Sequence, residues 1–341
     1  MLEWKKIGES CKTVSPPKKL EKELYGEEGL YPIIDQGQKD IVGYTFDESA
    51  LVPNGEYILF GDHTRYVKYH KGVFAQGADG LKILRAVEGV LPRYFYFAFA
   101  NTEVPSRGYS RHWSIAKEML IPIPSLSEQS RIVNILDTFT ASIENLKQQI
   151  AQRRKQYEHF RDQLLDLEGK EGVEMKMVGE VCELKRGVRV VKRDLDENGE
   201  IPVFQNCLSP MGFYKHSNSM GHTFVIIGGA AGDIGYCEKP FWAADDCLCI
   251  SGNPFLIDKY VYVYLRKNQH YIKSQVRRAG VPRLSRSVIE NLSIPVPSME
   301  EQSRIVSILD TFEASIANLK EQLKEREKQY EYYRNKLLTF E

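Results

Sequence analysis

The stretch Ile121-Pro122-Ile123-Pro124-Ser125 opens a run of 48 residues that occurs a second time, from Ile294 to Glu341. The second copy follows 173 residues after the first without an insertion or deletion, and 31 of the 48 positions carry the same residue. A repeat of this length means that the chain contains the same structural unit twice. We therefore expect two equivalent halves, each ending in the same element.

Each copy starts with the signal of a helix N-terminus. Ser125 and Glu128 form a Ser-x-x-Glu capping box, and Ser298 and Glu301 form the same box in the second copy. In such a box the serine oxygen accepts a hydrogen bond from an N–H of the first turn, and the glutamate bonds back to the cap residue. Apolar and aromatic residues then recur at alternating spacings of four and three, with one arginine in each series. The positions are Ile132, Leu136, Phe139, Ile143, Leu146, Ile150, Arg153, Tyr157, Phe160, Leu164 and Leu167, and then Ile305, Leu309, Phe312, Ile316, Leu319, Leu323, Arg326, Tyr330, Tyr333, Leu337 and Phe340.

This seven-residue period predicts a left-handed coiled coil of two long helices, which end at Glu168 and Glu341. The first helix leads out of one globular segment and the second starts from the other, so they bury their seams on each other only by running antiparallel. This pairing gives the two halves a pseudo-twofold relation. About 42 residues at roughly 1.5 Å per residue make a rod of about 60 Å, which suits a spacer.

Arg153 and Arg326 occupy the same seam position in the two predicted helices. Two interpretations stay open. The long side chain can extend from the seam to water, or a single polar seam residue can fix the register of the helices. We favour the first, because burying a charged group without a partner is costly.

The segments before the two helices are predicted to be similar domains. Without gaps, Ile58–Gly61 lies over Val225–Gly228 and Phe74–Asp79 lies over Phe241–Asp246, at an offset of 167 residues. Short β-branched and aromatic runs bounded by glycine and aspartate are typical of strands with tight turns. The predicted fold class is α+β, with two similar mixed α/β domains and two long antiparallel helices in one internal repeat. The predicted boundaries are 1–126 for the first domain, 127–168 for the first helix, 169–299 for the second domain and 300–341 for the second helix.

The composition narrows the functional classes. The chain has 46 basic and 46 acidic residues, and the segment 169–299 has a small excess of 17 basic over 14 acidic residues. This balance differs from the strongly basic surface of a non-specific nucleic-acid binder. The six cysteines form no Cys-x-x-Cys pair, which indicates free thiols in a reducing cytoplasm. No apolar run is long enough to cross a membrane.

Each predicted helix also carries the sequence Glu-Gln-Ser-Arg-Ile-Val, at Glu128–Val133 and Glu301–Val306, followed by Ile-Leu-Asp. This motif follows Ile-Pro-[Ile/Val]-Pro-Ser in both copies, and the parts come in the order domain, helix, domain, helix. The whole pattern resembles the specificity subunits of type I restriction–modification systems, and the resemblance covers the entire chain.

The resemblance implies a function for each part. Each globular segment would be a target-recognition domain that reads one half of a split, asymmetric site in double-stranded DNA. The coiled coil would set the unread gap and dock two modification (methyltransferase) subunits, which bring S-adenosylmethionine. Restriction subunits that use ATP would join to translocate and cut DNA. The chain itself would be a non-catalytic cytoplasmic subunit without a cofactor.

The residues themselves show no catalytic constellation. The run Asn253–Phe255 (Asn-Pro-Phe) lacks the second proline of an adenine methyltransferase motif. The glycine-rich run Gly228–Gly232 is not followed by Gly-Lys-Ser/Thr, so a turn at a strand end is a better interpretation than a phosphate loop. Asp79, Asp245 and Asp246 suit turns or caps better than a metal site. We expect neither a metal site nor an activity of the chain's own.

Base reading needs arginine, lysine, asparagine or glutamine side chains at the edges of the bases, while other polar groups hold phosphates. The candidates in the first domain are His63, Arg65, Lys68, Tyr69, Arg107, Tyr109, Arg111 and His112. Those in the second domain are Asn206, Lys215, Arg277, Arg278, Arg283 and Arg286. The runs 107–112 and 277–286 are the stronger candidates, because both lie just before the repeated Ile-Pro. For any single residue, a solvated surface charge is the competing interpretation.

Two alternative functions stay open. The same modules would serve a combined restriction–methylation enzyme, which the sequence does not separate from a type I system. A coiled-coil scaffold with two protein-binding domains would show no preference for DNA sequence and would not copurify with a methyltransferase.

Overall fold

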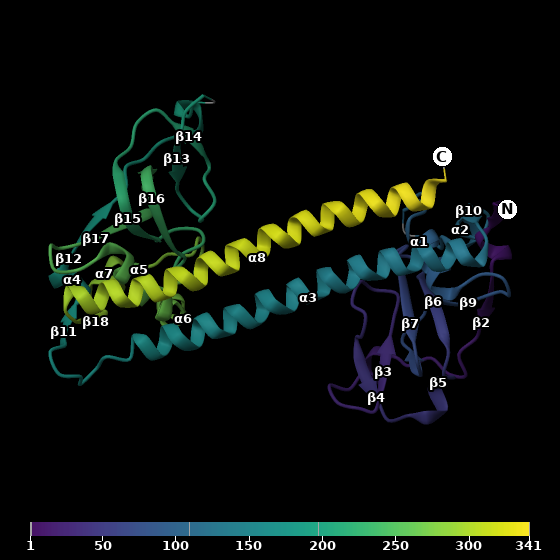
Figure 1. The fold of residues 1–341 in the computed structure, drawn as a ribbon. Coiled ribbons are helices and arrows are strands. Elements are labelled where there is room, and N and C mark those ends of the chain that lie inside the picture. Colours follow the sequence, from purple (N-terminus) through teal and green to yellow (C-terminus); the bar gives the residue numbers. More distant parts are fainter. Residues whose placement is uncertain (1, 109, 197, 341) are drawn as a thin grey trace. The chain divides into compact units, whose positions relative to one another are not determined.

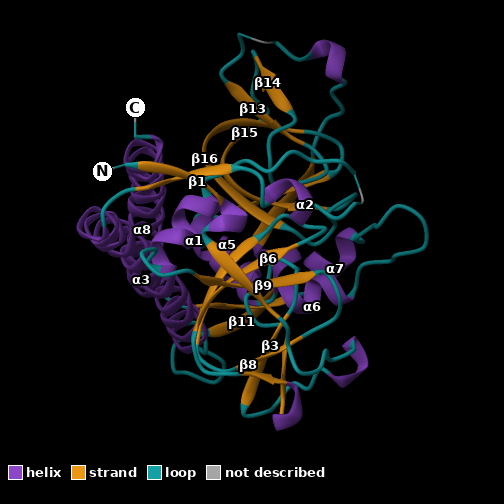
Figure 2. Ribbon diagram, turned by 90° about the vertical axis from the view of Figure 1, so that its right-hand side faces the viewer, coloured by secondary structure: helices purple, strands orange, loops and turns teal. Residues whose placement is uncertain are grey.

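The computed structural model describes residues 2–108, 110–196 and 198–340. The chain forms two compact units, Met1–Lys147 with Glu321–Glu341 and Gln148–Lys320. Each unit contains one mixed α/β domain and a part of each long helix, α3 (Leu126–Leu164) and α8 (Met299–Thr339) (Figure 1). Strands, short helices and loops contribute to both domains, as the colours of Figure 2 show.

The domain of the first unit is built on two four-stranded sheets. Their strand orders are β2-β9-β6-β7 and β4-β3-β8-β5, and β1 pairs with β10 in a third sheet. The bounds are β1 (Glu3–Lys6), η1 (Ile7–Glu9), β2 (Cys11–Val14), η2 (Lys22–Leu24), β3 (Tyr31–Ile34), β4 (Gly43–Thr45), η3 (Glu48–Ala50), β5 (Leu51–Val52), β6 (Glu56–Gly61), β7 (Val67–Lys71), β8 (Phe74–Gln76), β9 (Leu81–Ala86), α1 (Pro92–Ala100), α2 (Trp113–Ala116) and β10 (Leu120–Ile123). Buried side chains of α1, β6 and the start of α3 form one hydrophobic cluster. The long helix is therefore anchored to the domain from which it leaves.

The domain of the second unit has one six-stranded sheet. The strand order is β12-β17-β15-β16-β13-β14, and β11 pairs with β18. The bounds are β11 (Glu174–Met177), α4 (Val178–Val181), β12 (Cys182–Arg186), η4 (Lys192–Asp194), β13 (Ile201–Phe204), β14 (Gly212–Tyr214), β15 (Ser219–Ile226), β16 (Ile234–Ala243), β17 (Cys247–Gly252), α5 (Asp258–Lys267), α6 (Gln269–Ser274), α7 (Arg286–Glu290) and β18 (Ser293–Val296). Here α5 packs in one cluster with β15, β17 and the start of α8, as α1 does in the first unit.

The same parallel strand pair occurs in both domains. Ile33 of β3 pairs with Ala75 of β8, and Val203 of β13 pairs with Trp242 of β16, while the other ladders between named strands are antiparallel. In the first unit β7 and β8 are separated at Gly72, whose φ is +126°, whereas the continuous strand β16 takes both places in the second unit. The predicted fold class of two similar mixed α/β domains and two long helices is confirmed.

The ladders correct one part of the gapless alignment. The offset of 167 matches Ala75 with Trp242, but it places Leu59 over Ile226. In the ladders Leu59 pairs with Ile83 and Phe224 pairs with Cys249, in corresponding places of the two sheets. Leu59 therefore corresponds to Phe224, two residues before Ile226. A shift of two residues keeps every side chain on its face of the sheet, which is why the hydrophobic pattern did not reveal it.

The first long helix is shorter than predicted. α3 ends at Leu164 rather than at Glu168. Leu165 and Leu167, which are 2% and 4% exposed, turn into the core of the second domain. The spacing that predicted the last helical turn thus belongs to the domain core. α8 ends at Thr339, where the following residue, Phe340, has a φ of +52°.

The two helices run antiparallel along each other in both units. In the first unit Phe139 stacks on Tyr333 with ring centroids 5.3 Å apart, and Lys147 pairs with Glu327 at 3.6 Å. Positions therefore rise along α3 as they fall along α8. In the second unit Phe160 stacks on Phe312 at 5.4 Å. Aromatic side chains fill the seam at corresponding places.

The two seam arginines lie against aromatic rings. The guanidinium of Arg153 lies 5.8 Å from the ring centre of Phe312, and that of Arg326 lies 5.7 Å from the ring centre of Phe139. Both side chains are half-buried. Each charge is thus stabilised by the face of a ring on the opposite helix. The extended, partly solvated arrangement agrees with the favoured interpretation, and the ring contact adds a partner that the sequence did not identify.

The predicted caps form only in part. The serine oxygens of Ser125 and Ser298 accept hydrogen bonds from the N–H groups three residues later, at 3.4 and 3.3 Å. The carboxylates of Glu128 and Glu301 do not bond back to the cap. They pair with the arginines three residues further along each helix, Arg131 and Arg304, with shortest distances of 2.6 Å. None of the helices in the described part of the chain is long and apolar enough to span a bilayer.

Candidate nucleic-acid interface

A short basic hairpin lies at one edge of the second domain. The backbone N–H and C=O groups of Arg277 and Arg283 bond to each other at 2.9 and 3.0 Å, which closes the hairpin. Leu284 N–H then donates to the carbonyl of Ile227, directly after β15. Arg277, Arg278 and Arg283 are all exposed. Their positively charged groups are therefore presented from a backbone that is fixed to the sheet.

Two further loops meet this hairpin. The carbonyl of Asn206, an exposed residue after β13, accepts a hydrogen bond from Ala230 N–H at 2.9 Å. Gly229 N–H donates to the carbonyl of Pro282 at 3.2 Å. The glycine-rich run thus forms a turn after β15, as expected, and connects Asn206 with the hairpin. A hollow of about 270 Å³ lies between this turn, Lys273 and Arg278.

The two other candidates of this domain are placed differently. Lys215 follows β14, at the end of the β13–β14 pair opposite to Asn206. Arg286 begins α7, and its Nε lies 2.7 Å from the carboxylate of Glu290 in the same helix. The structure therefore brings together Asn206, Arg277, Arg278 and Arg283, but neither Lys215 nor the charge of Arg286 belongs to that group.

The loop 107–112 of the first domain is held from inside by His112. This histidine is 0% exposed. Its Nε2 accepts a hydrogen bond from Arg107 N–H at 3.1 Å, and its Nδ1 lies 3.0 Å from the carbonyl of Asp62. These partners assign the proton of the neutral ring to Nδ1. His112 is a support of the loop, while Arg107 and Arg111 are exposed beside it.

The other first-domain candidates divide into exposed and buried side chains. Arg65 is exposed, has a φ of +63°, and donates from Nη1 to the carbonyl of Val104 at 2.9 Å. This bond joins the turn after β6 to the segment that leads into the loop 107–112. His63 is half-buried, and its backbone N–H donates to Gln36 Oε1. Tyr109 lies outside the described residues.

Lys68 and Tyr69, also candidates for reading bases, lie in a strand and are largely covered. Lys68 is 6% exposed, and its Nζ donates to the carbonyls of Asp35, at 3.1 Å, and Lys39. Burial lowers the pKa of Lys68. Tyr69 is half-buried, and burial raises its pKa to about 12. Lys68 and Tyr69 are neighbours in β7, so their side chains lie on opposite faces of the sheet, and each is at least half-buried there. The exposed cationic group of this edge is Arg65, Arg107 and Arg111.

Arg111 and Arg283 occupy the same place in the two domains. Arg111 precedes His112, whose N–H donates to the carbonyl of Asp62, just after β6, at 2.8 Å. Arg283 precedes Leu284, whose N–H donates to the carbonyl of Ile227, just after β15, at 3.0 Å. A short helix, α2 or α7, follows in both cases. The two sequence runs that lie before the repeated Ile-Pro are therefore structurally equivalent.

Residues 1–153 and 170–328 both match the family described as "Type I restriction modification DNA specificity domain". The chain belongs to this family. It is 28% identical to the specificity subunit of the type I restriction enzyme EcoR124I/EcoR124II from Escherichia coli, over 99% of this chain and 94% of that protein.

Two solved structures share the fold of this specificity chain. The S subunit of a type I restriction-modification system from M. genitalium superimposes with a TM-score of 0.74 at 21% identity, over 100% of this chain and 97% of that chain. A chain from a structure on complex assembly and conformational transition of a type I R-M system gives a TM-score of 0.58 at 16% identity, over 98% and 96%.

Each specificity domain is joined to its long helix by a cation that contacts aromatic rings. In the first domain the guanidinium of Arg93 lies 4.6 Å from the ring centre of Tyr69, and 5.1 and 4.8 Å from those of Tyr96 and Phe97. Its Nε and Nη2 both lie 2.7 Å from Asp137 Oδ1, on α3. Arg93 thus connects the sheet, α1 and the long helix.

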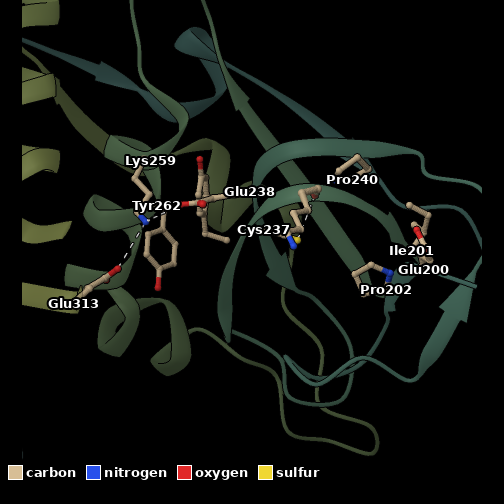
Figure 3. A pocket seen from close by; sticks show the side chains of 11 residues that line it. Glu200, Ile201, Pro202, Cys237, Glu238, Pro240, Lys259, Tyr262 and Glu313 are labelled. Atoms are coloured by element: carbon tan, nitrogen blue, oxygen red, sulfur yellow. Dashed lines mark hydrogen bonds and ion pairs between the residues drawn. The ribbon is translucent and has the colours of Figure 1, made fainter. Parts of the chain in front are cut away.

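In the second specificity domain Lys259 takes this position. Its Nζ lies 4.9 Å from the ring centre of Tyr236, and 3.2 and 3.7 Å from carboxylate oxygens of Asp310 and Glu313 on α8. Figure 3 shows Lys259 directed at Glu313 beside Tyr262 and Glu238, at the margin of a cavity of about 800 Å³. Burial opposes the charge of Lys259, but the bond to Asp310 and the nearby carboxylates outweigh it and raise the pKa of the amine.

A buried glutamine fixes the start of each long helix, and sequence reasoning missed its role. Gln129 and Gln302 are both 0% exposed. The amide nitrogen of Gln129 donates to the carbonyls of Gly89 and Pro124 at 3.0 and 2.9 Å, and its oxygen accepts from Leu91 N–H at 2.8 Å. Gln302 makes the same three contacts at equivalent positions, each at 2.9 Å. A signal was present, because Gln129 continues the spacing of the apolar seam toward the N-terminus.

Proposed function

We propose that this chain is the DNA specificity subunit of a type I restriction–modification complex. Each domain reads one half of a bipartite site in double-stranded DNA. The observation that carries the proposal is that the two similar domains present an exposed arginine at the same edge, Arg111 in the first and Arg283 in the second. The chain that contains them belongs to the DNA specificity family. The family match does not favour the protein-binding scaffold.

The two domains read different sequences, because equivalent positions of their edges carry different side chains. The first edge presents Arg65, Arg107 and Arg111, and the second presents Asn206, Arg277, Arg278 and Arg283. Arginine and asparagine are the side chains that recognise guanine and adenine edges in the major groove, and the remaining cations suit phosphates. The recognised site is therefore split and asymmetric.

The paired helices set the unread gap and bind two modification subunits. The repeat supports this part, since 31 of 48 positions are identical and each helix offers the same exposed groups to a partner. One such group is the Glu128–Arg131 pair, which recurs as Glu301–Arg304. S-adenosylmethionine and ATP bind to the modification and restriction subunits. This chain supplies recognition and no reaction of its own, in the cytoplasm.

A map of methylated adenines tests the proposal. The chain and the modification subunit encoded beside it are expressed together in a host without adenine methylation, and the genome is read by long-read sequencing. We expect a split motif that is absent when the modification subunit is expressed alone. Methylation that does not depend on this chain, or no new methylation with a folded modification subunit present, contradicts the proposal.

A further inference from the structure

We infer that Arg283 reads a guanine in the half-site of the second domain, and that Asp246 is the residue that positions it. The inference rests on the proposed function, and it names the base that is recognised, the residue that recognises it and the residue that positions that side chain. Its basis is a three-residue arrangement of Arg283, Asp246 and Gly228 at the edge of the sheet.

The backbone of Arg283 is fixed on both sides. Its N–H and C=O bond to Arg277 across the hairpin, at 3.0 and 2.9 Å. The next residue, Leu284, bonds to the carbonyl of Ile227 at the end of β15. Arg283 also forms an isolated β-bridge with Gly228. A side chain that extends from so fixed a backbone loses less conformational freedom when it binds than one on a free loop.

Asp246 then fixes the side chain itself. Its Oδ1 lies 2.7 Å from Arg283 Nη1, and the two side chains are 18% and 47% exposed. Asp246 is held in turn, because its carbonyl accepts a hydrogen bond from Ile227 N–H at 2.8 Å. A guanidinium has five N–H donors in a planar fork. With Nη1 held by Asp246, the edge formed by Nε and Nη2 is the one that can make a bidentate contact.

Gly228 is required by this pair rather than by a phosphate. A Cβ at position 228 would lie 2.4 Å from Asp246 Oδ1 and 2.9 Å from Arg283 Nη1. Real Cβ atoms do not approach other atoms so closely, so any side chain here would displace the ion pair. Gly228, the first residue of the glycine-rich run, therefore leaves the space that the ion pair of Arg283 and Asp246 occupies.

The chemistry of the pair selects a base over the DNA backbone. A carboxylate beside the guanidinium repels a phosphate, whereas the O6 and N7 atoms of guanine are neutral acceptors that match two parallel N–H donors. Among the described residues no carboxylate forms an ion pair with Arg277 or Arg278, which lie on the exposed part of the hairpin. They suit the phosphates that flank the base.

The first domain lacks the same arrangement. Gly80 takes the place of Asp246. The carbonyl of Gly80 accepts a hydrogen bond from Asp62 N–H, just as the carbonyl of Asp246 accepts one from Ile227 N–H. The neighbouring Asp79 pairs with Lys19 at 2.6 Å. Arg111 is therefore not fixed in the way of Arg283, and variants of the Asp246 arrangement should leave the first half-site unaffected.

The test uses the complex of the full chain with its modification subunit and duplexes in which each position of the second half-site is varied. At one guanine, the wild-type complex should discriminate about 10- to 100-fold against other bases, as a bidentate contact does. Arg283→Ala and Asp246→Asn should both lose most of that discrimination at this position only. Replacing that guanine by 7-deazaguanine, which lacks the N7 acceptor, should weaken wild-type binding but not the binding of Arg283→Ala.

Arg286→Ala is the matched control, because it removes a neighbouring arginine whose carboxylate partner, Glu290, lies in its own helix. It should leave base preference unchanged. Thermal unfolding of each variant reports folding separately. Equal weakening on all sequences by Arg283→Ala would assign a phosphate contact and overturn the inference, as would base preferences that neither variant changes. A wild-type complex without any split-site preference would instead overturn the proposed function itself.

Discussion

The two halves of the molecule agree at the joint between domain and helix and differ at the edge that we propose reads DNA. At the joint, Gln129 and Gln302 make the same three hydrogen bonds. Arg93 and Lys259 both insert a cation between aromatic rings and a helix carboxylate. At the proposed DNA-reading edge, by contrast, Asp246 lies where the first domain has Gly80. A duplicated chain can thus change the side chains at the edge of each domain while it keeps the contacts that attach each domain to its long helix.

The largest expected effect concerns the helices. A seven-residue insertion within Ile143–Ile150, matched by one within Ile316–Leu323, keeps the seam in phase. It adds about 10 Å of helix, or about three base pairs of DNA. We expect methylation of sites with the original gap to be lost and sites with a longer gap, but the same two halves, to be methylated. A motif with an unchanged gap would show that the helices do not set it.

The buried glutamines should give the next largest effect. Gln129→Ala removes the side-chain partner of two buried carbonyls and one N–H. This should lower the free energy of unfolding by about 3 kcal/mol, since each buried group left without a partner costs about 1–3 kcal/mol. Gln302→Ala should cost a similar amount. Urea unfolding measures both, and Ser127→Ala, on the exposed first turn of α3, is the control. Clearly unequal losses would contradict the equivalence of the two joints.

The cations at the joint should matter less, because they are partly solvated. Arg93→Met and Lys259→Met keep most of the side-chain volume but remove the ring and carboxylate contacts, and each should cost about 1–2 kcal/mol. Both variants should also broaden the range of gaps that is methylated, since the domain is held less firmly on its helix. An unfolding loss without any change in gap tolerance would limit the joint to a role in stability.

The smallest effect on the free energy of unfolding should come from two buried tyrosines. Their contribution should also make stability depend on pH above about pH 10. Tyr94 and Tyr260 donate from their hydroxyls to the carbonyls of Pro122 and Pro295 at 2.7 and 3.0 Å. Burial raises the pKa of both hydroxyls far above their ordinary value. Their contribution is therefore complete below the unfolded pKa of about 10 and is lost as the pH rises from there toward the folded pKa.

The matched variants are Tyr94→Phe and Tyr260→Phe. At pH 7 each should lower the free energy of unfolding by about 1 kcal/mol, the typical value of one hydrogen bond. Above pH 10 the wild-type chain should lose stability faster than either variant. Chemical unfolding at pH 7 and pH 10.5 provides the comparison, and parallel pH curves would show that the hydroxyls do not titrate differently in the folded chain.

The sequence predicted what depends on periodicity and repetition. The two long helices, their antiparallel pairing and the similarity of the domains all follow from the 173-residue repeat and the seven-residue spacing. The turn of Leu167 into the domain core was not predicted, because its place in the seven-residue spacing fits a helix and a core equally well. The two-residue error between β6 and β15 had the same origin, since it preserves the face of every residue.

The structural equivalence of the two candidate runs was predictable, but the contacts of their residues were not. The runs 107–112 and 277–286 lie at equivalent edges, as their position before the repeated Ile-Pro indicated. The burial of Lys68 and His112 and the pairing of Arg283 with Asp246 depend on contacts across 29 to 50 residues of sequence. No local pattern distinguishes such a residue from one that is free to reach DNA.

The central claim is that the two domains recognise the two half-sites independently. Its most direct test is a pair of methylation maps for Arg111→Ala and Arg283→Ala, each expressed with the modification subunit. The account predicts that Arg111→Ala relaxes or changes the first half of the split motif and leaves the second half and the gap intact. Arg283→Ala should do the reverse. If either variant altered both halves together, or reduced methylation equally at every sequence, the two domains would not be independent readers and the central claim would fail.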